Sequence, residues 1–449
     1  MLRKKNERNT TPTRVESTGL RLLIAAFALV PLINGAQADD ATLLVESCKR
    51  YDRFVQLGSE DPVVHPCMTI DPDLGGLRRA LAEYGIGISA GVTTLFNYNL
   101  RNDDTITQIY AGQEPTYAGS VLPTITYDLS RLGLNEGSQF VFKPVFNYNS
   151  YDGSGITGLH VNQLSARLPF WDNRIIVQAG VYYMGSQFYG SNIGDISGAA
   201  VLGSNSGLLF QTGISGWLPT PGVDIRFQTA DERLYNHVGF SRSLSPLGPE
   251  YEWDHNRSGL NFHIKDSELA IIDEIGFRVA SAPGQHKIWM RAGVIYNTSG
   301  YTQLSPPFAE EDNYGFYGVL DYQITQPDPE MPYKGWYINV KGNYGKPSVN
   351  AFAADVGATI YNIGPFQSRP LDLFAVSIGR NFISDDAITF YRNAGEDPAR
   401  NITTASVSYA LLVARGVYWN NTIAYTSTPT IVPQRKATYS ILSSLTLGF

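Results

Sequence analysis

The stretch YSILSSLTLGF, residues 439–449, alternates two kinds of side chain and decides the fold class of this chain. Counting back from Phe449 in steps of two, five of six positions are apolar or aromatic, whereas the intervening set holds one apolar side chain, Leu442. A period of two is typical of a strand with two unlike faces. A closing aromatic residue is typical of outer-membrane β-barrels, although a soluble sheet can end in the same way. The rest of the chain has to distinguish the two.

The same alternation recurs throughout the chain after Gly85. It is clear in five segments: 86–98, 287–296, 316–324, 336–341 and 405–411. The apolar sets often begin or end in Tyr, Trp or Phe, as the aromatic girdles of a membrane barrel require. Short connections are expected at 171–173, 282–284 and 414–416, and longer polar ones at 100–120, 185–207, 240–258, 300–313 and 391–400. Alternating short and long connections indicate a barrel whose two ends face different compartments.

The length of the repeating region predicts the size of the barrel. At about 20–25 residues per strand and connection, the roughly 365 residues after Gly85 form about sixteen strands, with fourteen or eighteen as alternatives. A barrel of that width encloses an aqueous channel and not a packed core. Only 17% of residues are charged, below the quarter or so that is usual in soluble proteins. We therefore predict an all-β, antiparallel transmembrane barrel over residues 85–449.

The N-terminal 38 residues have the order of features that a secretory signal peptide has. Six basic residues precede an apolar run at 22–32, and Ala36-Gln37-Ala38 fits the small-x-small cleavage rule, which makes Asp39 the first mature residue. The alternative is a buried helix. Cleavage removes six basic and two acidic side chains, so the formal charge changes from −7 to −11. So acidic a chain is a poor match for nucleic acid.

The only cysteines, Cys48 and Cys67, lie in the polar segment 39–72. An exported protein meets an oxidising compartment, so we predict a Cys48–Cys67 disulfide, with two free thiols as the alternative. A disulfide closing so short a loop stabilises by roughly 3 kcal/mol. His65 is near, but two cysteines and one histidine make a weak zinc site, and no metal or cofactor is expected.

Residues 73–84 carry the helical spacing that the rest of the mature chain lacks. Asp73 is a plausible N-cap and Gly85 ends the helix. We expect this short helix at or inside the lumen near one mouth, with Leu77, Leu81 and Tyr84 on the wall. Three charged residues then face the pore: Arg78, Arg79 and Glu83. The alternative is a helix that lies peripherally in the periplasm.

Three stretches carry a resemblance to a known family. They are DLGGLRRALAEYGI at 73–86, EIGFR at 274–278 followed by KIWMRAG at 287–293, and NYGFYGVLDYQ at 313–323. They resemble the carbohydrate-selective porins of the OprB-like family, over essentially the whole chain after residue 72. The resemblance implies a sixteen-stranded barrel in a Gram-negative outer membrane, passing monosaccharides and related polyols down their gradient. The partners are then outer-membrane lipid, small sugars or polyols, and the barrel-assembly machinery, which engages the strand ending in Phe449. The barrel is a monomer or a homotrimer.

A sugar filter needs flat surfaces for the apolar face of a pyranose ring and polar groups for its hydroxyls. Strand parity points one set of such side chains into the lumen. The candidates are Asp224, Arg226, Glu274, Arg278, Trp289, Arg291, Asp321, Gln323, Tyr337, Asn339 and Lys341. Charges of both signs across a lumen orient polar solutes. The alternative is that these residues hold one another in salt bridges and select nothing.

Other functional classes fit the sequence less well. None of the six histidines lies in a nucleophile elbow or a His-Glu-x-x-His motif, so an enzyme is disfavoured. A secreted β-rich carbohydrate-binding protein explains the signal peptide but not the apolar strand faces. Within the porin class, the sequence is compatible with two alternatives to a sugar-selective pore. These are a general-diffusion pore and a pore for another small solute.

Overall fold

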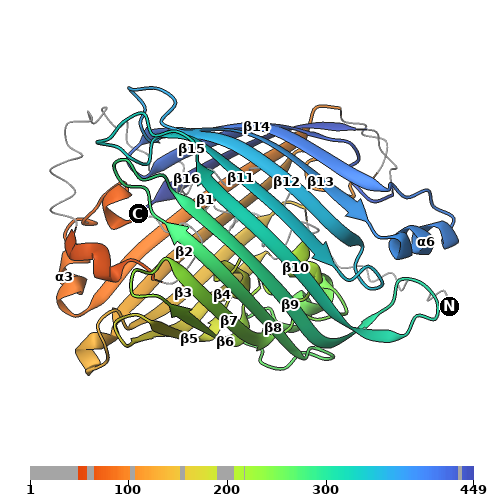
Figure 1. Ribbon diagram of the computed structural model, residues 1–449, viewed down its shortest axis with the longest axis horizontal. Helices are drawn as coiled ribbons and strands as arrows, with labels where there is room; N and C mark the ends of the chain where they lie inside the picture. Colours follow the sequence, from red (N-terminus) through yellow and green to blue (C-terminus); the bar gives the residue numbers. More distant parts are fainter. Residues whose placement is uncertain are drawn as a thin grey trace, which may run out of the picture. The chain divides into compact units, whose positions relative to one another are not determined.

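The computed structural model describes residues 49–57, 65–101, 107–151, 157–189, 207–216, 218–432 and 437–449. Sixteen antiparallel strands form one closed barrel in which each strand pairs with its neighbours in sequence and β1 pairs with β16 (Figure 1). The predicted fold class and the predicted strand number are both confirmed. The predicted signal peptide 1–38 and Cys48 lie outside the described residues, so the Cys48–Cys67 disulfide stays a prediction.

The strands have the following bounds: β1 (Ile86–Asn99), β2 (Thr116–Asp128), β3 (Gln139–Asn149), β4 (Gly158–Phe170), β5 (Ile175–Tyr182), β6 (Thr220–Gln228), β7 (Leu234–Arg242), β8 (Leu269–Val279), β9 (Ile288–Thr302), β10 (Glu310–Gln323), β11 (Gly335–Gly345), β12 (Phe352–Ile363), β13 (Leu373–Ile383), β14 (Asn401–Ala414), β15 (Val417–Thr426) and β16 (Thr438–Gly448).

The helical segments are short: η2 (Lys49–Phe54), η3 (Pro66–Met68), α3 (Leu77–Glu83), η4 (Leu129–Leu132), η6 (Met184–Ser186), α4 (Leu208–Gln211), α5 (Pro249–His255) and α6 (Asp385–Asn393). Within the described ranges, no helix combines the length and the apolar character that crossing a membrane requires.

The pairing of β1 with β16 closes the barrel. Val92 lies opposite Leu447, and the register continues without a break to Asn99 opposite Ser440. Beyond the strand, Phe449 and Ala90 exchange two backbone hydrogen bonds of 2.8 Å each. The alternating stretch that ends the chain therefore forms the seam of the barrel.

The two faces of the wall differ as the alternation predicts. On β15, Trp419 and Ile423 point outward and are 45% and 62% exposed, whereas Asn420 and Thr422 point inward and are buried. Every strand has two hydrogen-bonded neighbours, so the sheet has no free edge whose backbone N–H and C=O groups would face lipid without a partner. The outer face is thus an apolar belt and the inner face is polar.

The two mouths of the barrel differ in their connections. We call the end with α3 and the C-terminus the proximal mouth, and the end with α6 the distal mouth (Figure 1). The predicted short turns at 171–173, 282–284 and 414–416 all connect strands at the proximal mouth. The predicted loops 100–120 and 300–313 are too long, since β2 begins at Thr116 and β9 runs to Thr302. The apolar alternation marks only the lipid-facing part of a strand, and these strands continue beyond it.

The two-faced wall makes a testable prediction about charge. Val407 lies in the middle of β14 and is 48% exposed on the outer face. Val407→Arg should lower the free energy of unfolding in lipid vesicles by about 2–4 kcal/mol, because it moves a charge into the hydrocarbon. Thr404→Arg, on the lumen face of the same strand, is the control. Equal losses for both variants, measured by urea titration, would contradict the assignment of the faces.

Candidate functional site

The connection between β5 and β6 folds into the lumen. We call its described residues 183–189 and 207–216 the inner loop. Phe188, Leu208 and Ile214 of this loop are fully buried in one cluster with Ile272 and Ile295 from the inner face of β8 and β9. Gly213 has a φ of +81°, and a Cβ there would come within 2.2 Å of the Asn297 side chain, so glycine is required at this close approach. The inner loop narrows the lumen along β5 to β11.

A buried carboxylate anchors the inner loop. Glu274 of β8 has no exposed surface, and its Oε2 accepts hydrogen bonds from the Tyr189 backbone N–H at 2.9 Å and the Tyr317 hydroxyl at 2.7 Å. Its Oε1 accepts from the Tyr235 hydroxyl at 2.7 Å. Tyr235 in turn accepts from the indole N–H of Trp289 at 3.0 Å. Because three donors satisfy this carboxylate, it links the inner loop to three strands at low cost.

An ion pair lies beside this anchor. Arg291 Nη1 lies 2.9 Å from Asp321 Oδ2, and the guanidinium stacks 3.6 Å from the Trp289 ring centre. Its Nε donates to the Tyr189 carbonyl. The amide of Asn339 donates to the other oxygen of Asp321 at 2.8 Å. All of these side chains are buried, so the predicted filter residues hold the inner loop and leave little surface for a solute.

A second buried cluster contains two more of the predicted residues. Asp224 Oδ1 lies 2.7 Å from His237 Nε2, and its Oδ2 accepts from the Tyr182 hydroxyl at 2.5 Å. Phe188 of the inner loop stacks on the His237 ring at 4.1 Å. Arg226 Nη2 lies 3.5 Å from the other ring nitrogen of His237. This cluster also fixes the inner loop against the wall.

Two predicted residues hold the turns at the proximal mouth. The amide of Gln323 donates to the Pro332 carbonyl at 2.7 Å and to the Lys334 carbonyl at 3.1 Å. The hydroxyl of Tyr337 donates to the Tyr333 carbonyl at 2.5 Å. Both residues are buried. Their contacts stabilise the connection between β10 and β11.

The last two predicted residues are only half-buried. Arg278 Nη2 lies 3.6 Å from Glu232 Oε2 in the turn before β7, at the proximal mouth. Lys341 lies on the inner face of β11, and a Cβ at Gly357 would come within 3.1 Å of its Cε. The aliphatic part of the Lys341 side chain therefore lies against the inner wall, over Gly357 of β12.

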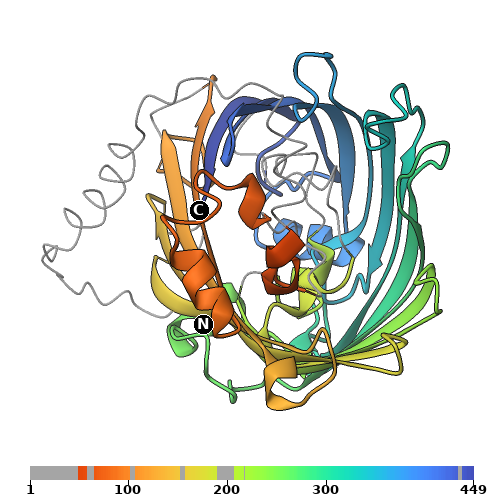
Figure 2. The same cartoon turned by 90° about the vertical axis from the view of Figure 1, so that its left-hand side faces the viewer.

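An N-terminal segment also enters the lumen. Gln56 Nε2 donates to Gln163 Oε1 at 2.9 Å, and Gln139 Nε2 donates to the Val55 carbonyl at 2.9 Å. Gln139 and Gln163 lie on the inner faces of β3 and β4, so residues 51–57 line the wall there. Figure 2 shows this part of the chain, in red and orange, within the barrel opening.

The helix α3 is shorter than predicted and is turned differently. Arg78 is buried and donates to the carbonyls of Pro72 and Ile88, so it does not face the pore, and that expectation is wrong. Leu77 and Tyr84 are 52% and 70% exposed, so they do not lie on the wall either. The physical reason is local: carbonyls of the preceding turn and of Ile88 at the start of β1 surround the guanidinium, which helical periodicity cannot indicate. Arg79 and Glu83 are exposed.

On the rest of the lumen wall, the inward residues in the same row as Asn339, which donates to Asp321, are uncharged. One row of paired inward residues runs from the network around β11 to β1: Asn339, Thr359, Ser377, Ser406, Ala424, Ser440 and Asn99. Hydroxyls and amides therefore replace the charges and aromatic rings within a single row. The lumen has one charged wall that holds loops, and an uncharged wall from β13 to β1; on β11 and β12, Lys341 and Asp355 still face inward.

A cavity of about 280 Å³ opens on the uncharged wall toward the distal end. Its polar lining comes from Asn97, Tyr110, Thr404, Ser406, Thr422, Thr426, Thr438 and Ser440. The hydroxyl of Ser406 is buried and has no hydrogen-bond partner, and the same is true of both amide atoms of Asn420, which lies outside this cavity on the same wall, four residues along β15 from the pairing partner of Ser406. Buried polar groups are normally paired, so these groups are available to a solute or to water. The cavity is at the small end of the range for ligand sites, about 300–1,000 Å³.

Comparison with known proteins agrees with this architecture. Residues 126–415 match the family described as carbohydrate-selective porin, OprB family. The chain belongs to this family. Its fold and membership place it in the outer membrane of a Gram-negative bacterium, as a porin. No curated relative matches the chain.

Solved structures of other porins share the fold of this OprB-family chain. Pseudomonas putida OprB at high pH has a TM-score of 0.72 and 14% identity, covering 88% of this chain and 100% of that one. The low-pH structure of the same protein gives 0.55 and 14%, with 85% and 98% covered. The outer membrane channel DcaP of Acinetobacter baumannii gives 0.50 and 10%, with 81% and 97% covered.

Sequence reasoning missed the partners that bury the predicted residues in this porin. Tyr235 and His237 lie on the inward parity of β7, and that alternation was the available signal. The inner-loop residue Tyr189 carried no signal, because it contacts Glu274 across 85 positions of sequence. Ser406 was also missed, although it alternates with the apolar residues of β14.

The anchoring role of Glu274 can be tested electrically. Glu274→Gln replaces one acceptor oxygen with a donor, so at least one of three buried donors loses its partner, at a cost of about 1–3 kcal/mol. The inner loop should loosen, and single-channel conductance in planar bilayers should rise. Asp273→Asn makes the same change on the adjacent, outward-pointing residue and should leave conductance unchanged. Identical conductance in both variants would contradict the anchoring role.

The attachment of α3 should survive mild acid. Hydrogen bonds from Tyr51, at 2.6 Å, and from Arg79 lower the pKa of Asp73 below its ordinary 3.8. A lowered pKa means that the stabilisation is complete above pH 3.8 and is lost as the pH falls through the folded value. Amide protection factors of α3 should therefore stay constant from pH 7 to about 4. Asp73→Asn should lower them at every pH, and a wild-type decrease above pH 5 would contradict this assignment.

Proposed function

We propose that neutral monosaccharides and related polyols diffuse passively through this porin along its uncharged wall. The observation that carries this proposal is the division of the lumen. Glu274 accepts hydrogen bonds from three donors and Arg291 pairs with Asp321, although Arg291 Nη2 has no hydrogen-bond partner. On the opposite side, Ser406 and Asn420 offer uncharged polar atoms without a partner. A passing sugar therefore meets hydroxyls and amides before it meets charges.

Weak contacts suit a channel better than strong ones. Each hydrogen bond that a sugar makes with the wall replaces one with water, so the net gain is only about 0.5–1.5 kcal/mol. A solute must bind well enough to enter and weakly enough to leave. Neutral hydroxyl donors and acceptors satisfy both conditions for a polyol.

The charged wall contributes to selection indirectly. Its ion pairs hold the inner loop in the lumen, and the loop sets the width that a solute must pass. Because Arg291 is paired with Asp321 at 2.9 Å, the transverse field available to a solute is smaller than isolated charges would give. This arrangement favours sugar selectivity over general diffusion, which depends on an open and more strongly polarised lumen.

We propose conduction without catalysis. His237 and Asp224 form a hydrogen-bonded pair at 2.7 Å, but the second ring nitrogen of His237 faces Arg226 and the ring face is covered by Phe188. A nucleophile would need that nitrogen as its general base. The pair therefore suits a structural role.

Two partner expectations belong to this proposal. The strand ending in Phe449 is expected to engage the barrel-assembly machinery, and the barrel is expected to function as a monomer or a homotrimer. The surrounding membrane and small sugars follow from the family.

The uncharged wall can be tested without disturbing the fold. Ser406→Ala removes a hydroxyl that has no partner, so stability should not change, whereas glucose affinity in the channel should fall roughly two- to tenfold. The control is Ser377→Ala in the same row, whose hydroxyl already bonds Thr359 at 2.8 Å. Liposome swelling with glucose measures both variants. An equal effect of the two substitutions would contradict contact at Ser406.

A further inference from the structure

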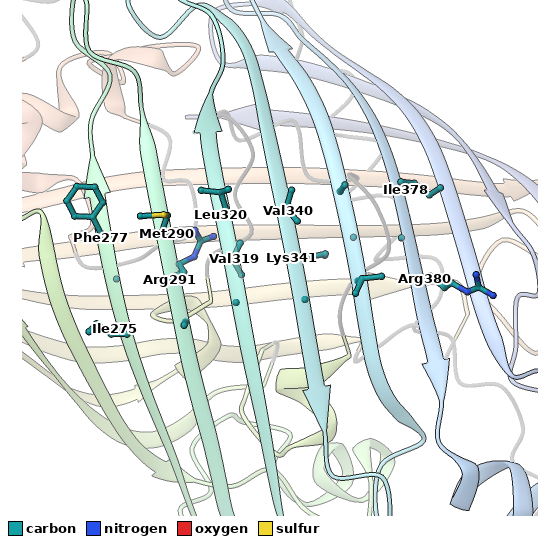
Figure 3. A pocket seen from close by; sticks show the side chains of 18 of the residues that line it. Ile275, Phe277, Met290, Arg291, Val319, Leu320, Val340, Lys341, Ile378 and Arg380 are labelled. Atoms are coloured by element: carbon teal, nitrogen blue, oxygen red, sulfur yellow. The ribbon is translucent and has the colours of Figure 1, made fainter.

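The outer wall of the barrel carries a trough. Ala292, Gly318 and Gly342 lie directly opposite one another on β9, β10 and β11, with their positions on the outward face. A Cβ built on Gly318 or Gly342 would meet nothing within 4 Å. These three residues line part of a shallow hollow of about 1110 Å³ that extends along the outer wall from Leu234 of β7 to Thr403 of β14 (Figure 3). The membrane-facing wall is therefore recessed at this place.

Large apolar side chains border the trough on both sides. The proximal ridge consists of residues paired across neighbouring strands: Met290, Leu320, Val340, Ala358 and Ile378. The distal ridge is paired in the same way: Val294, Phe316, Tyr344, Ala354 and Phe382. The trough runs between these ridges, across the strands and not along them.

A cation stands at one end of the trough. Gly342 pairs with Val356 and Val356 pairs with Arg380, which lies three residues before the distal end of β13. Arg380 is exposed, and its guanidinium lies 5.6 Å from the Phe382 ring. Figure 3 shows it at the edge of the hollow. Among the described residues, the ion pairs do not include it.

The dimensions of the trough match one leaflet of a bilayer. Four strand spacings of about 4.8 Å separate Arg380 from Ala292, so the two residues are about 19 Å apart, with the 50% exposed side chain of Val356 in the same row between Gly342 and Arg380. The strands of a membrane barrel are tilted by about 45° from the membrane normal, and a row of paired residues runs perpendicular to them, so the row is inclined at the same angle. The trough therefore descends about 14 Å into the membrane. Half of a hydrocarbon core of about 30 Å is about 15 Å. Arg380 then lies at the level of the headgroups when the trough lies in the acyl region.

We propose that this trough is a binding site for a phosphate-bearing membrane lipid. One acyl chain lies over Ala292, Gly318 and Gly342, between the two ridges, and Arg380 pairs with the lipid phosphate. An arginine suits this role because its guanidinium binds phosphate oxygens in a bidentate manner. A second copy of the chain is the less favoured occupant. The acidic residue Asp273 on the same outer face accepts a hydrogen bond from the Asn236 amide at 2.6 Å within its own barrel.

The test compares lipid retention by the full-length protein in detergent, measured by native mass spectrometry. The probes are dioleoyl phosphatidylglycerol and dioleoylglycerol, which share their chains and differ in the phosphate. Arg380→Gln should weaken retention of phosphatidylglycerol about fivefold and leave dioleoylglycerol unchanged, because one arginine near the membrane surface contributes little more than that. Gly318→Leu should weaken retention of both, because it fills the trough.

The matched control is Ala179→Leu, which enlarges another exposed residue on the outer face, on β5. It should retain both lipids as the wild type does. Wild-type retention by both Arg380→Gln and Gly318→Leu would overturn the proposal. So would a Gly318→Leu variant that converts an oligomer into monomers while Ala179→Leu does not, because the trough would then hold a second copy.

Discussion

Closure of the sheet is the constraint on which the rest of this structure depends. In lipid no water is available to bond an unpaired strand edge, so the exchange of hydrogen bonds between Phe449 and Ala90, and the register of β16 on β1, must be complete. A wall of sixteen strands encloses more space than its own side chains fill. The protein fills part of that space with the inner loop and residues 51–57, and what they leave free is the channel.

The charged residues of the lumen act mainly on the protein itself. Inside the barrel, a carboxylate such as Glu274 is stable only when donors surround it, and the donors come from a loop that would otherwise be free to move. The same contacts that satisfy the charge therefore fix the width of the channel. Selection among solutes then falls to side chains that are polar but uncharged, on the opposite wall. This division explains how one lumen combines a rigid constriction with weak binding.

Wall polarity and the inward direction of residues such as Asp321 could be predicted from the period of two, and the strand number from the length of the region that carries this period. The parity held for Trp289 and Arg291 because the register shift between β9 and β10, at Glu311/Asn313, lies toward the distal end of β9 and beyond both residues. What an inward side chain contacts could not be predicted. Tyr189 reaches Glu274 from a loop with no periodicity, and the carbonyls that bind Arg78 belong to the turn before α3 and to Ile88 of β1. Both depend on tertiary contacts that a local pattern does not contain.

The central claim is that a sugar passing this porin binds weakly to an uncharged wall. Current block by sugars in planar bilayers tests it most directly, with neutral monosaccharides compared against a sugar acid of the same size. The account predicts brief, concentration-dependent block by neutral monosaccharides, and weaker block by the acid, because the described inward positions of β13 to β16 and β1 carry no cation. Absence of block by every sugar would contradict the account and indicate a general-diffusion pore.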